Sequence, residues 1–147
     1  MTKKEEGSLK LEDQLCFPLY VASRKVISLY QPYLKKLNIT YTQYIVLMVL
    51  WENDNIAVSE LGRRLFLDNG TLTPLLKKME LQGYLTRQRS RKDERMVIIS
   101  LTQDGMALKE KCSDIPSRIA EALDVDQEKF DELYSLLYDV IRKLYGT

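Results

Sequence analysis

The residues from Leu67 to Leu101 read LDNGTLTPLLKKMELQGYLTRQRSRKDERMVIISL. Their first part places apolar side chains at positions 72, 75, 76 and 79, which share one face of a helix, and leaves polar side chains for another surface. Gly83 is expected to end this helix, because glycine readily takes the left-handed conformation that closes a helix. The last part, from Met96 to Leu101, is an uncharged, β-branched run typical of a strand.

A cluster of positive charge separates the helix from this strand. Five basic side chains fall within nine residues and flank a short loop: Arg87, Arg89, Arg91, Lys92 and Arg95. A helix followed by a basic hairpin is the arrangement with which a winged helix-turn-helix binds duplex DNA. The sequence therefore predicts that fold for this part of the chain. The alternative is that the basic run is only a solvated hairpin, as most charge runs are.

Charge is unevenly distributed along the chain. The protein has 147 residues, of which 45% are hydrophobic and 29% charged, and this composition fits one compact domain with an adequate core. Its formal net charge is only +1, which by itself argues weakly against a nucleic-acid partner. Residues 59–95, however, carry +4, and residues 102–147 carry −4. We expect the acidic C-terminal third to lie away from DNA.

Composition also excludes several classes of protein. No apolar stretch reaches the roughly 18 residues that cross a bilayer, and residues 1–6 lack the apolar core of a signal peptide, so a cytoplasmic location is expected. The absence of histidine excludes catalysis that relies on it. The two cysteines are too few for a structural zinc site within one chain. No metal and no cofactor are expected.

The N-terminal part predicts one long helix over residues 9–36. Its apolar side chains cover more than one face, which indicates a partner on more than one side. Pro18 predicts a kink two residues past Cys16, because proline removes a backbone hydrogen bond and crowds the preceding turn. Pro32 predicts a second bend or the end of the helix.

Capping residues mark the helices that follow. Thr40 and Gln43 fit a capping box, and the helix they begin, which runs to about residue 53, is apolar all round and therefore central. A short helix is expected over residues 58–66, and Asp68 or Asn69 is expected to cap the helix that reads DNA.

The C-terminal part predicts two more helices. Thr102 is expected to cap the first, and the second covers residues 126–145 with apolar side chains at helical spacing. The predicted fold is mainly α with a small β wing, in the order α-α-α-α-β-β-α-α within a single domain of residues 1–147. Residues 41–101 form the winged helix-turn-helix. Residues 9–36 and 103–145 form dimerisation helices, because one reading helix covers only a half-site.

The predicted DNA contacts lie on the reading helix and the wing. The helix supplies Asn69, Thr71, Thr73, Pro74, Lys77 and Lys78. Asparagine can pair with adenine, threonine can meet a thymine methyl group, and lysine can reach phosphate or guanine. The wing supplies Arg87, Arg89, Arg91, Lys92, Asp93 and Arg95, with Arg95 near the tip and aimed at the minor groove.

Over residues 9–145 the chain resembles the MarR family of winged-helix regulators. The motifs that carry the resemblance are Asp68-x-Gly70-Thr71-Leu72-Thr73-Pro74-Leu75-Leu76-Lys77-Lys78-Met79-Glu80, Arg87-x-Arg89, Asp93-x-Arg95 and Leu101-Thr102-x-x-Gly105. Residues 11–17 and 38–41 are similar to the branch that responds to organic hydroperoxide. Two departures are Pro18, where relatives have an ordinary helix former, and Asn69, where serine is commoner; the second affects which operator is read.

The resemblance implies a dimeric repressor of an inverted-repeat operator, with half-sites about 10 bp apart. In such proteins an organic hydroperoxide oxidises the cysteine matching Cys16 to a sulfenic acid, and reaction with a small thiol then moves the reading helices off DNA. Two tyrosines of the partner subunit, matching Tyr30 and Tyr41, donate hydrogen bonds to that sulfur. Two such donors favour thiolate over thiol.

Other interpretations of the same residues stay open at this point. Cys16 could be no more than a small apolar residue on a helix. Cys112 is expected to be inert, and it resolves oxidised Cys16 only if their Cα atoms come within about 7 Å. The competing functions are a repressor released by a small aromatic ligand, a thiol peroxidase, and a protein-interaction module with an idle wing. The peroxidase has little support, because no arginine or histidine is evident beside the thiol.

Overall fold

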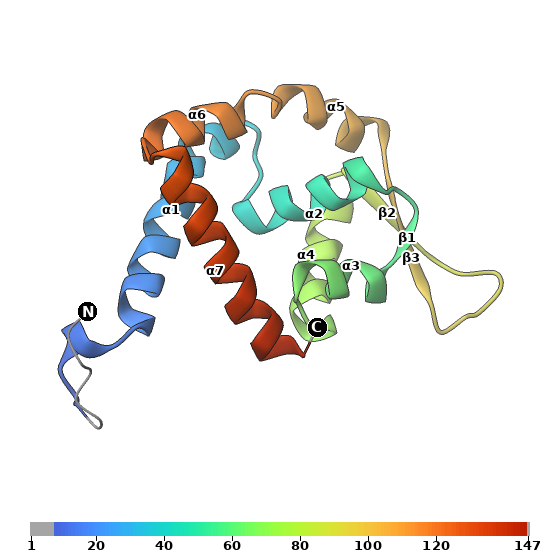
Figure 1. Ribbon diagram of the computed structural model, residues 1–147. Coiled ribbons are helices and arrows are strands. Elements are labelled where there is room, and N and C mark those ends of the chain that lie inside the picture. Colours follow the sequence, from blue (N-terminus) through green and yellow to red (C-terminus); the bar gives the residue numbers. More distant parts are fainter. Residues whose placement is uncertain (1–7, 147) are drawn as a thin grey trace. The chain divides into compact units, whose positions relative to one another are not determined.

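The computed structural model describes residues 8–146, which are mainly helical with one small sheet (Figure 1). In chain order the elements are η1 (Leu11–Asp13), α1 (Cys16–Lys36), α2 (Tyr41–Glu52), β1 (Ile56–Ala57), α3 (Val58–Leu65), α4 (Asn69–Leu81), β2 (Leu85–Arg89), β3 (Val97–Leu101), α5 (Gln103–Lys111), α6 (Ile115–Leu123) and α7 (Gln127–Tyr145). The described residues divide into two compact units, one ending at Ile115 and one beginning at Pro116. Each is described by itself.

The first helix begins later than predicted. A single 3₁₀ turn, η1, precedes it, and Gln14 Nε2 donates to the carbonyl of Ser8 over 2.8 Å, so the chain leaves helical geometry before Cys16. The predicted helix over residues 9–36 is therefore wrong in its first seven residues. The kink predicted at Pro18 is wrong for the same reason, because Pro18 lies in the first turn of α1, where backbone N–H groups have no helical partner. At the other end, α1 passes through Pro32 to Lys36, which excludes the predicted end there.

The second helix begins with the predicted capping box. Gln43 N donates to Thr40 Oγ1 over 3.3 Å, and Thr40 N donates to Gln43 Oε1 over 3.1 Å. Val46, Leu47 and Leu50 of this helix are at most 1% exposed. Helix α2 is thus the centre of the first unit, as its all-round apolar sequence predicts.

Helices α3 and α4 form the helix-turn-helix. Gly62 allows the turn between them, because a Cβ atom there would lie 2.7 Å from the carbonyl oxygen of Leu67. Asp68 is the N-cap of α4, with its Oδ1 accepting from Thr71 N over 2.7 Å. Gly83, at a φ of 83°, follows the end of α4 as predicted.

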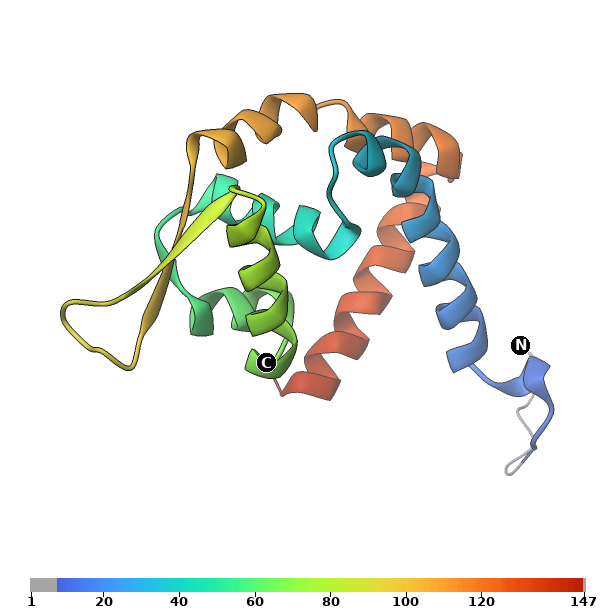
Figure 2. The same cartoon turned by 180° about the vertical axis from the view of Figure 1, so that it is seen from behind.

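The sheet has three antiparallel strands in the order β1-β3-β2. The hairpin of β2 and β3 pairs Arg87 with Ile99, and this hairpin is the predicted wing. Strand β1 pairs Ile56 with Ile99 from the other side. The sequence misses β1, since a strand of two residues is too short to show alternation. In Figures 1 and 2 the hairpin projects beyond the helices of the first unit.

Three helices follow the wing, whereas the sequence predicts two. Thr102 caps α5 as expected, through a bond from Gly105 N to its Oγ1. The chain then turns at Cys112, and Ile115 N donates to the carbonyl of Cys112 over 3.1 Å before α6 begins. Pro116 favours a new helix here, because proline fits a first turn and disfavours helical geometry in the residue before it.

Candidate nucleic-acid interface and redox site

Helix α4 has a buried core face and an exposed polar face. Leu72, Leu76 and Met79 are buried to 1% exposure or less. The side chains predicted to contact DNA all lie exposed: Asn69, Thr71, Thr73, Pro74, Lys77 and Lys78. The predicted orientation of the helix is therefore confirmed, while contact with bases stays a prediction.

The N-cap residue Asp68 stabilises the start of α4. The hydrogen bond from Thr71 N lowers the pKa of Asp68, and a further bond from the Thr71 side chain adds to this effect. Asp68 is therefore ionised throughout the neutral range and keeps the first turn of the reading helix closed.

The tip of the wing is ordered by Asp93. Its Oδ1 accepts from Arg95 N over 3.0 Å, and its carbonyl accepts from Met96 N over 3.0 Å. Ser90 N donates to the carbonyl of Met96 over 2.8 Å and closes the loop. Asp93, which the sequence groups with the DNA contacts, is thus a turn-forming residue of the tip.

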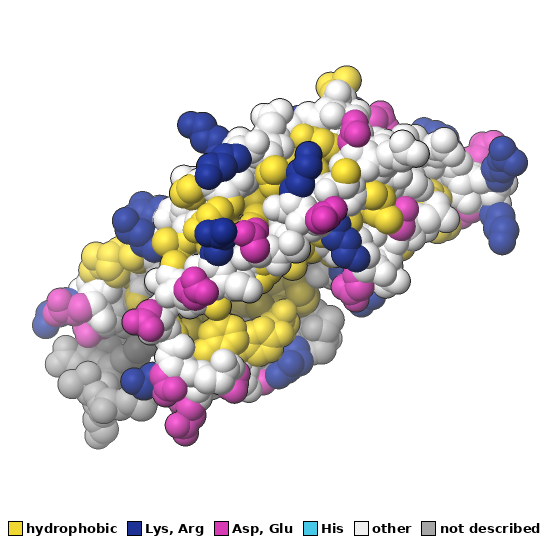
Figure 3. All heavy atoms as spheres, turned by 90° about the horizontal axis from the view of Figure 1, so that it is seen from above, with side chains coloured by type: hydrophobic (Ala, Val, Ile, Leu, Met, Phe, Trp, Pro, Cys, Tyr) yellow, Lys and Arg dark blue, Asp and Glu magenta, His cyan; other side chains and the backbone are white. Residues whose placement is uncertain are grey.

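The basic residues of the wing fall into two groups. Arg87 is only partly exposed: its backbone N donates to Glu80 Oε2 over 2.8 Å, and its Nε lies 3.4 Å from the same oxygen. Arg89 donates to the carbonyl of Glu94 over 2.9 Å. Arg91, Lys92 and Arg95 are exposed, and within residues 8–146 none of them forms an ion pair. Figure 3 shows basic side chains at the end where the wing projects.

The ion pair with Glu80 gives Arg87 a different role from the other wing cations. Its carboxylate partner lies on α4, so the pair fixes the reading helix against the wing. An ion pair of this kind also reduces the charge available for phosphate. We therefore regard Arg87 as a residue that positions α4, with Arg91, Lys92 and Arg95 as the stronger candidates for phosphate contact.

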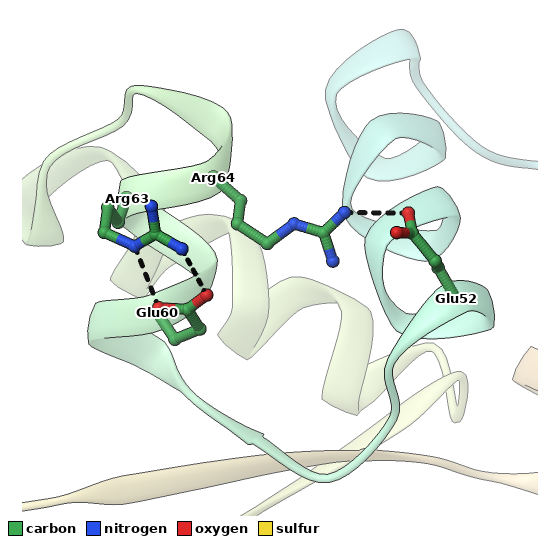
Figure 4. A network of polar contacts seen from close by, with 4 residues as sticks. All are labelled: Glu52, Glu60, Arg63 and Arg64. Carbon is green, nitrogen blue, oxygen red and sulfur yellow. Dashed lines mark hydrogen bonds and ion pairs between the residues drawn. The ribbon is translucent and has the colours of Figure 1, made fainter. Parts of the chain in front are cut away.

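The sequence did not predict a role for two arginines of α3, Arg63 and Arg64. Arg63 binds Glu60 of the same helix through two bonds, of 2.6 Å and 3.0 Å. Arg64 reaches Glu52 of α2 over 2.7 Å and ties the first helix of the helix-turn-helix to the central helix (Figure 4). The three-residue spacing of Glu60 and Arg63 was the available signal for the first pair. Nothing in the local sequence indicates the second.

A hollow of about 280 Å³ brings four of the twelve predicted DNA contacts together. Ser59 of α3, Asn69 and Thr73 of α4, and Arg87 and Arg95 of the wing all line it. Three elements separated in sequence thus present polar and basic groups to one surface. A surface of this composition suits the phosphates and base edges of a duplex.

Three tyrosines cluster where α1 meets α2. The rings of Tyr30 and Tyr41 meet edge to face with centroids 5.0 Å apart, and Tyr44 lies 5.8 Å from Tyr30. Burial raises the pKa of Tyr30 and of Tyr41, and for Tyr30 the neighbouring Tyr41 adds to the rise. Both hydroxyls therefore stay protonated at neutral pH and can donate hydrogen bonds.

Tyr44 provides a test of this cluster at high pH. Burial, followed by Tyr30, Cys112 and Tyr41, raises its pKa from 10.0 to about 12. Because the folded protein favours the neutral phenol, Tyr44 contributes to the free energy of unfolding. This contribution is complete below pH 10 and is lost as the pH rises through 12. We expect a loss of about 2–3 kcal/mol over that range.

The measurement is urea unfolding of wild type and Tyr44→Phe between pH 9 and pH 12. The variant should lose less stability with rising pH than the wild type. Tyr20→Phe, at an exposed tyrosine of α1, is the control and should follow the wild type. Parallel curves for wild type and Tyr44→Phe would contradict the assignment.

Cys16 is the first residue of α1 and is exposed. Its neighbours Leu15 and Phe17 are 58% and 41% exposed, so the thiol lies on an uncovered apolar surface. Cys16 and Tyr30 are fourteen residues apart on one helix, which places them about 21 Å apart along its axis. The structure therefore does not bring Cys16 to the tyrosines of its own chain.

Cys112 has the opposite environment. It is 3% exposed, and burial together with the charge of Asp114 raises the pKa of its thiol. A buried, protonated thiol is a poor nucleophile. This supports the expectation that Cys112 is inert and argues against a resolving role.

Two further absences concern residues 8–146 only. In that range no group of three or more His, Cys, Asp and Glu side chains is placed to hold a metal ion. No helix of the same range has the length and apolar character needed to cross a membrane.

Comparison with known proteins places this geometry in a family. The model of the transcriptional regulator family SarA/Rot matches residues 28–112. The organic hydroperoxide resistance transcriptional regulator of Bacillus subtilis is 51% identical over 137 residues, which cover 93% of each chain. The chain belongs to the MarR and SarA family of transcriptional regulators. The resemblance found in the sequence is thereby confirmed, including its organic hydroperoxide branch.

Solved structures agree with this family. Reduced AbfR bound to DNA is 36% identical, with a TM-score of 0.78 over 92% of this chain and 93% of that one. A structure of disulfide-formed AbfR is 38% identical, with a TM-score of 0.62 over 89% and 92%. Members of the MarR and SarA family regulate transcription and are not enzymes, which removes the thiol peroxidase from consideration.

Proposed function

We propose that this regulator is a cytoplasmic homodimer that represses transcription from an inverted-repeat operator and releases it when an organic hydroperoxide oxidises Cys16. The observation that carries the proposal is the position of Cys16. An exposed thiol at the start of a long helix, surrounded by uncovered apolar side chains, is accessible to a peroxide with a hydrocarbon tail. The relative from B. subtilis carries organic hydroperoxide resistance in its name.

The sensing step is a two-electron oxidation of sulfur. The Cys16 thiolate attacks the outer oxygen of the hydroperoxide, the O–O bond breaks, and the departing alkoxide takes up a proton and leaves as the alcohol. The product is a sulfenic acid, which condenses with a small thiol to a mixed disulfide and water.

Tyr30 and Tyr41 are proposed to serve the thiol of the opposite subunit. Because about 21 Å of helix separates Cys16 from Tyr30 within a chain, these hydroxyls can reach only the sulfur of a second copy. Their raised pKa values keep them as donors. In the proposed dimer each sensor is therefore built from two chains. Oxidation of Cys16 in one subunit then alters the hydrogen bonds of Tyr30 and Tyr41 in the other.

A second copy also explains the uncovered apolar surface. In the second unit α7 exposes apolar side chains on several faces, among them Phe130, Leu133, Leu136, Val140 and Leu144. Exposed apolar surface of this extent indicates an interface. The symmetry of a homodimer then predicts an operator of two half-sites related by a twofold axis.

The repressor released by a small ligand remains the second candidate. The observation in its favour is a hollow of about 520 Å³ in the first unit, lined by Ile27, Leu34, Tyr41 and Lys78 among others. Its lining combines apolar side chains with two lysines, Lys35 and Lys78, and this combination suits a small aromatic acid.

Operator release by wild type and Cys16→Ser decides between the two. A labelled duplex from upstream of the protein's own gene is titrated in fluorescence anisotropy, with and without cumene hydroperoxide plus cysteine. We expect both proteins to bind the duplex when reduced. After oxidation, only the wild type should release it, with a Kd at least about tenfold higher. Cys112→Ala, the control at the buried thiol, should respond as the wild type does. Equal behaviour of wild type and Cys16→Ser would favour the ligand-released repressor.

A further inference from the structure

The turn between α1 and α2 is tied to the far end of the reading helix. Gln82, the C-cap residue of α4, donates from Nε2 to the carbonyl of Asn38 over 3.0 Å. Its Oε1 accepts from Gln43 Nε2 over 2.7 Å. Gln43 Oε1 in turn accepts from Thr40 N over 3.1 Å. One chain of hydrogen bonds thus joins the end of α4 to both sides of the turn that precedes Tyr41.

This chain of bonds is buried at its centre. Gln43 is 1% exposed and is a buried polar residue amid the apolar core of the first unit. A buried amide that loses a hydrogen-bond partner destabilises the fold, which favours keeping both side-chain bonds of Gln43. The link is therefore a rigid connection between the turn and α4.

A second connection reaches the same turn. Tyr84, which follows α4, donates from its hydroxyl to the carbonyl of Leu37 over 3.2 Å. The backbone of the turn is unusual as well, since Asn38 has a φ of 56°. Two successive carbonyls of the turn thus accept hydrogen bonds from side chains that lie just after α4.

The turn leads directly into the proposed sensor. Tyr41 follows Thr40, and its ring meets that of Tyr30 at 5.0 Å. Any shift of Tyr41 displaces the capping box of Thr40 and Gln43, and with it the partner of Gln82. The hollow of about 520 Å³ is lined by Asn38, Tyr41 and Gln82, so it gives the turn room to move.

We propose that Gln82, together with Gln43, is the positioning residue that transmits the oxidation state of the sensor to the reading helix. The inference rests on the proposed function, because it needs oxidised sulfur to displace Tyr41. Gln82 touches neither the thiol nor the reading face at the start of α4. It acts only by making the end of α4 follow the turn, which changes how the start of the helix meets the major groove.

Gln82→Glu tests the link with the smallest change in shape. A carboxylate still accepts from Gln43 but cannot donate to the carbonyl of Asn38. Gln103→Glu, at the exposed first residue of α5, is the matched control with the same change of charge. Tyr84→Phe removes the second connection, and the variant with both changes removes the two together.

Three quantities are measured for each protein: the Kd for the operator when reduced, the rate of Cys16 oxidation by cumene hydroperoxide from mass spectrometry, and the Kd after complete oxidation in the presence of cysteine. Urea unfolding checks that each variant is folded. A merely structural role for Gln82 would alter reduced affinity or stability and leave the ratio of the two Kd values unchanged.

We expect Gln82→Glu to oxidise at the wild-type rate and to bind the operator within about threefold of wild type when reduced. The factor by which oxidation weakens binding should fall at least fivefold, the lower end of allosteric coupling, and further in the double variant. Gln103→Glu should keep the wild-type factor. An unchanged factor in both Gln82→Glu and the double variant overturns the inference alone. A wild type that keeps its operator when oxidised overturns the proposed function as well.

Discussion

Gly105→Ala is expected to destabilise the folded protein by about 3 kcal/mol or more. A Cβ atom at this position would lie 2.0 Å from the carbonyl oxygen of Tyr84 and 3.0 Å from Cδ2 of Leu101. The Tyr84 carbonyl is fixed in place because it accepts a hydrogen bond from Thr102 N. Gly105 is fixed as well, because its own carbonyl accepts from Trp51 Nε1 over 2.9 Å. Overpacking against backbone is among the larger effects of single substitutions.

The sign of this effect distinguishes packing from helix propensity. Gly105 lies inside α5, where replacement by alanine would by propensity alone stabilise the helix by up to about 1 kcal/mol. Gly70→Ala is the matched control in α4, since a Cβ atom there meets only Asp68 Oδ1, at 3.3 Å. Urea unfolding at one protein concentration should show Gly105→Ala far below wild type and Gly70→Ala within about 1 kcal/mol of it. Equal stability of the two variants would mean that α5 does not need its close approach to Tyr84.

The elements that sequence predicted well are those with local chemical signals. Thr40, Asp68 and Thr102 each cap a helix with a side-chain bond to a nearby backbone N–H, and Gly83 closes α4. Caps and left-handed glycines depend on a few neighbouring residues, so their pattern is visible in the chain. The exposed face of α4 could be predicted for the same reason, because helical periodicity is local.

The elements that sequence missed depend on distant partners. Strand β1 exists because β3 pairs with it, and its two residues carry no pattern of their own. Arg87 looks like the other wing cations in the sequence, and only the fold reveals Glu80 beside it. The same holds for Gln43, whose bond to Gln82 spans 39 positions. For the redox site, the family resemblance selected Tyr30 and Tyr41 beside Cys16, and only the fold shows that the rings of these two tyrosines meet.

Removal of Arg91, Lys92 and Arg95, the wing cations whose side chains have neither an ion pair nor a hydrogen bond within residues 8–146, should have the largest effect on function. In the proposed dimer, the variant Arg91→Ala/Lys92→Ala/Arg95→Ala loses six positive charges from the DNA-binding surface. If each contacts a phosphate, the slope of log Kobs against log salt concentration falls in magnitude by about 5, and affinity falls at least about a hundredfold at physiological salt. The tip itself should persist, because Asp93 orders it through backbone N–H groups.

The control removes the same charge elsewhere. Lys109→Ala/Lys111→Ala/Lys129→Ala changes three exposed lysines of α5 and α7. Anisotropy titrations across a range of salt concentrations should leave its slope close to that of wild type, since general attraction to DNA depends much less on charges outside the interface. Equal losses in the two variants would show that net charge alone governs binding. A wing variant that keeps the wild-type slope would instead leave phosphate recognition to α3 and α4, with Arg63, which is 72% exposed, as the next cation to replace.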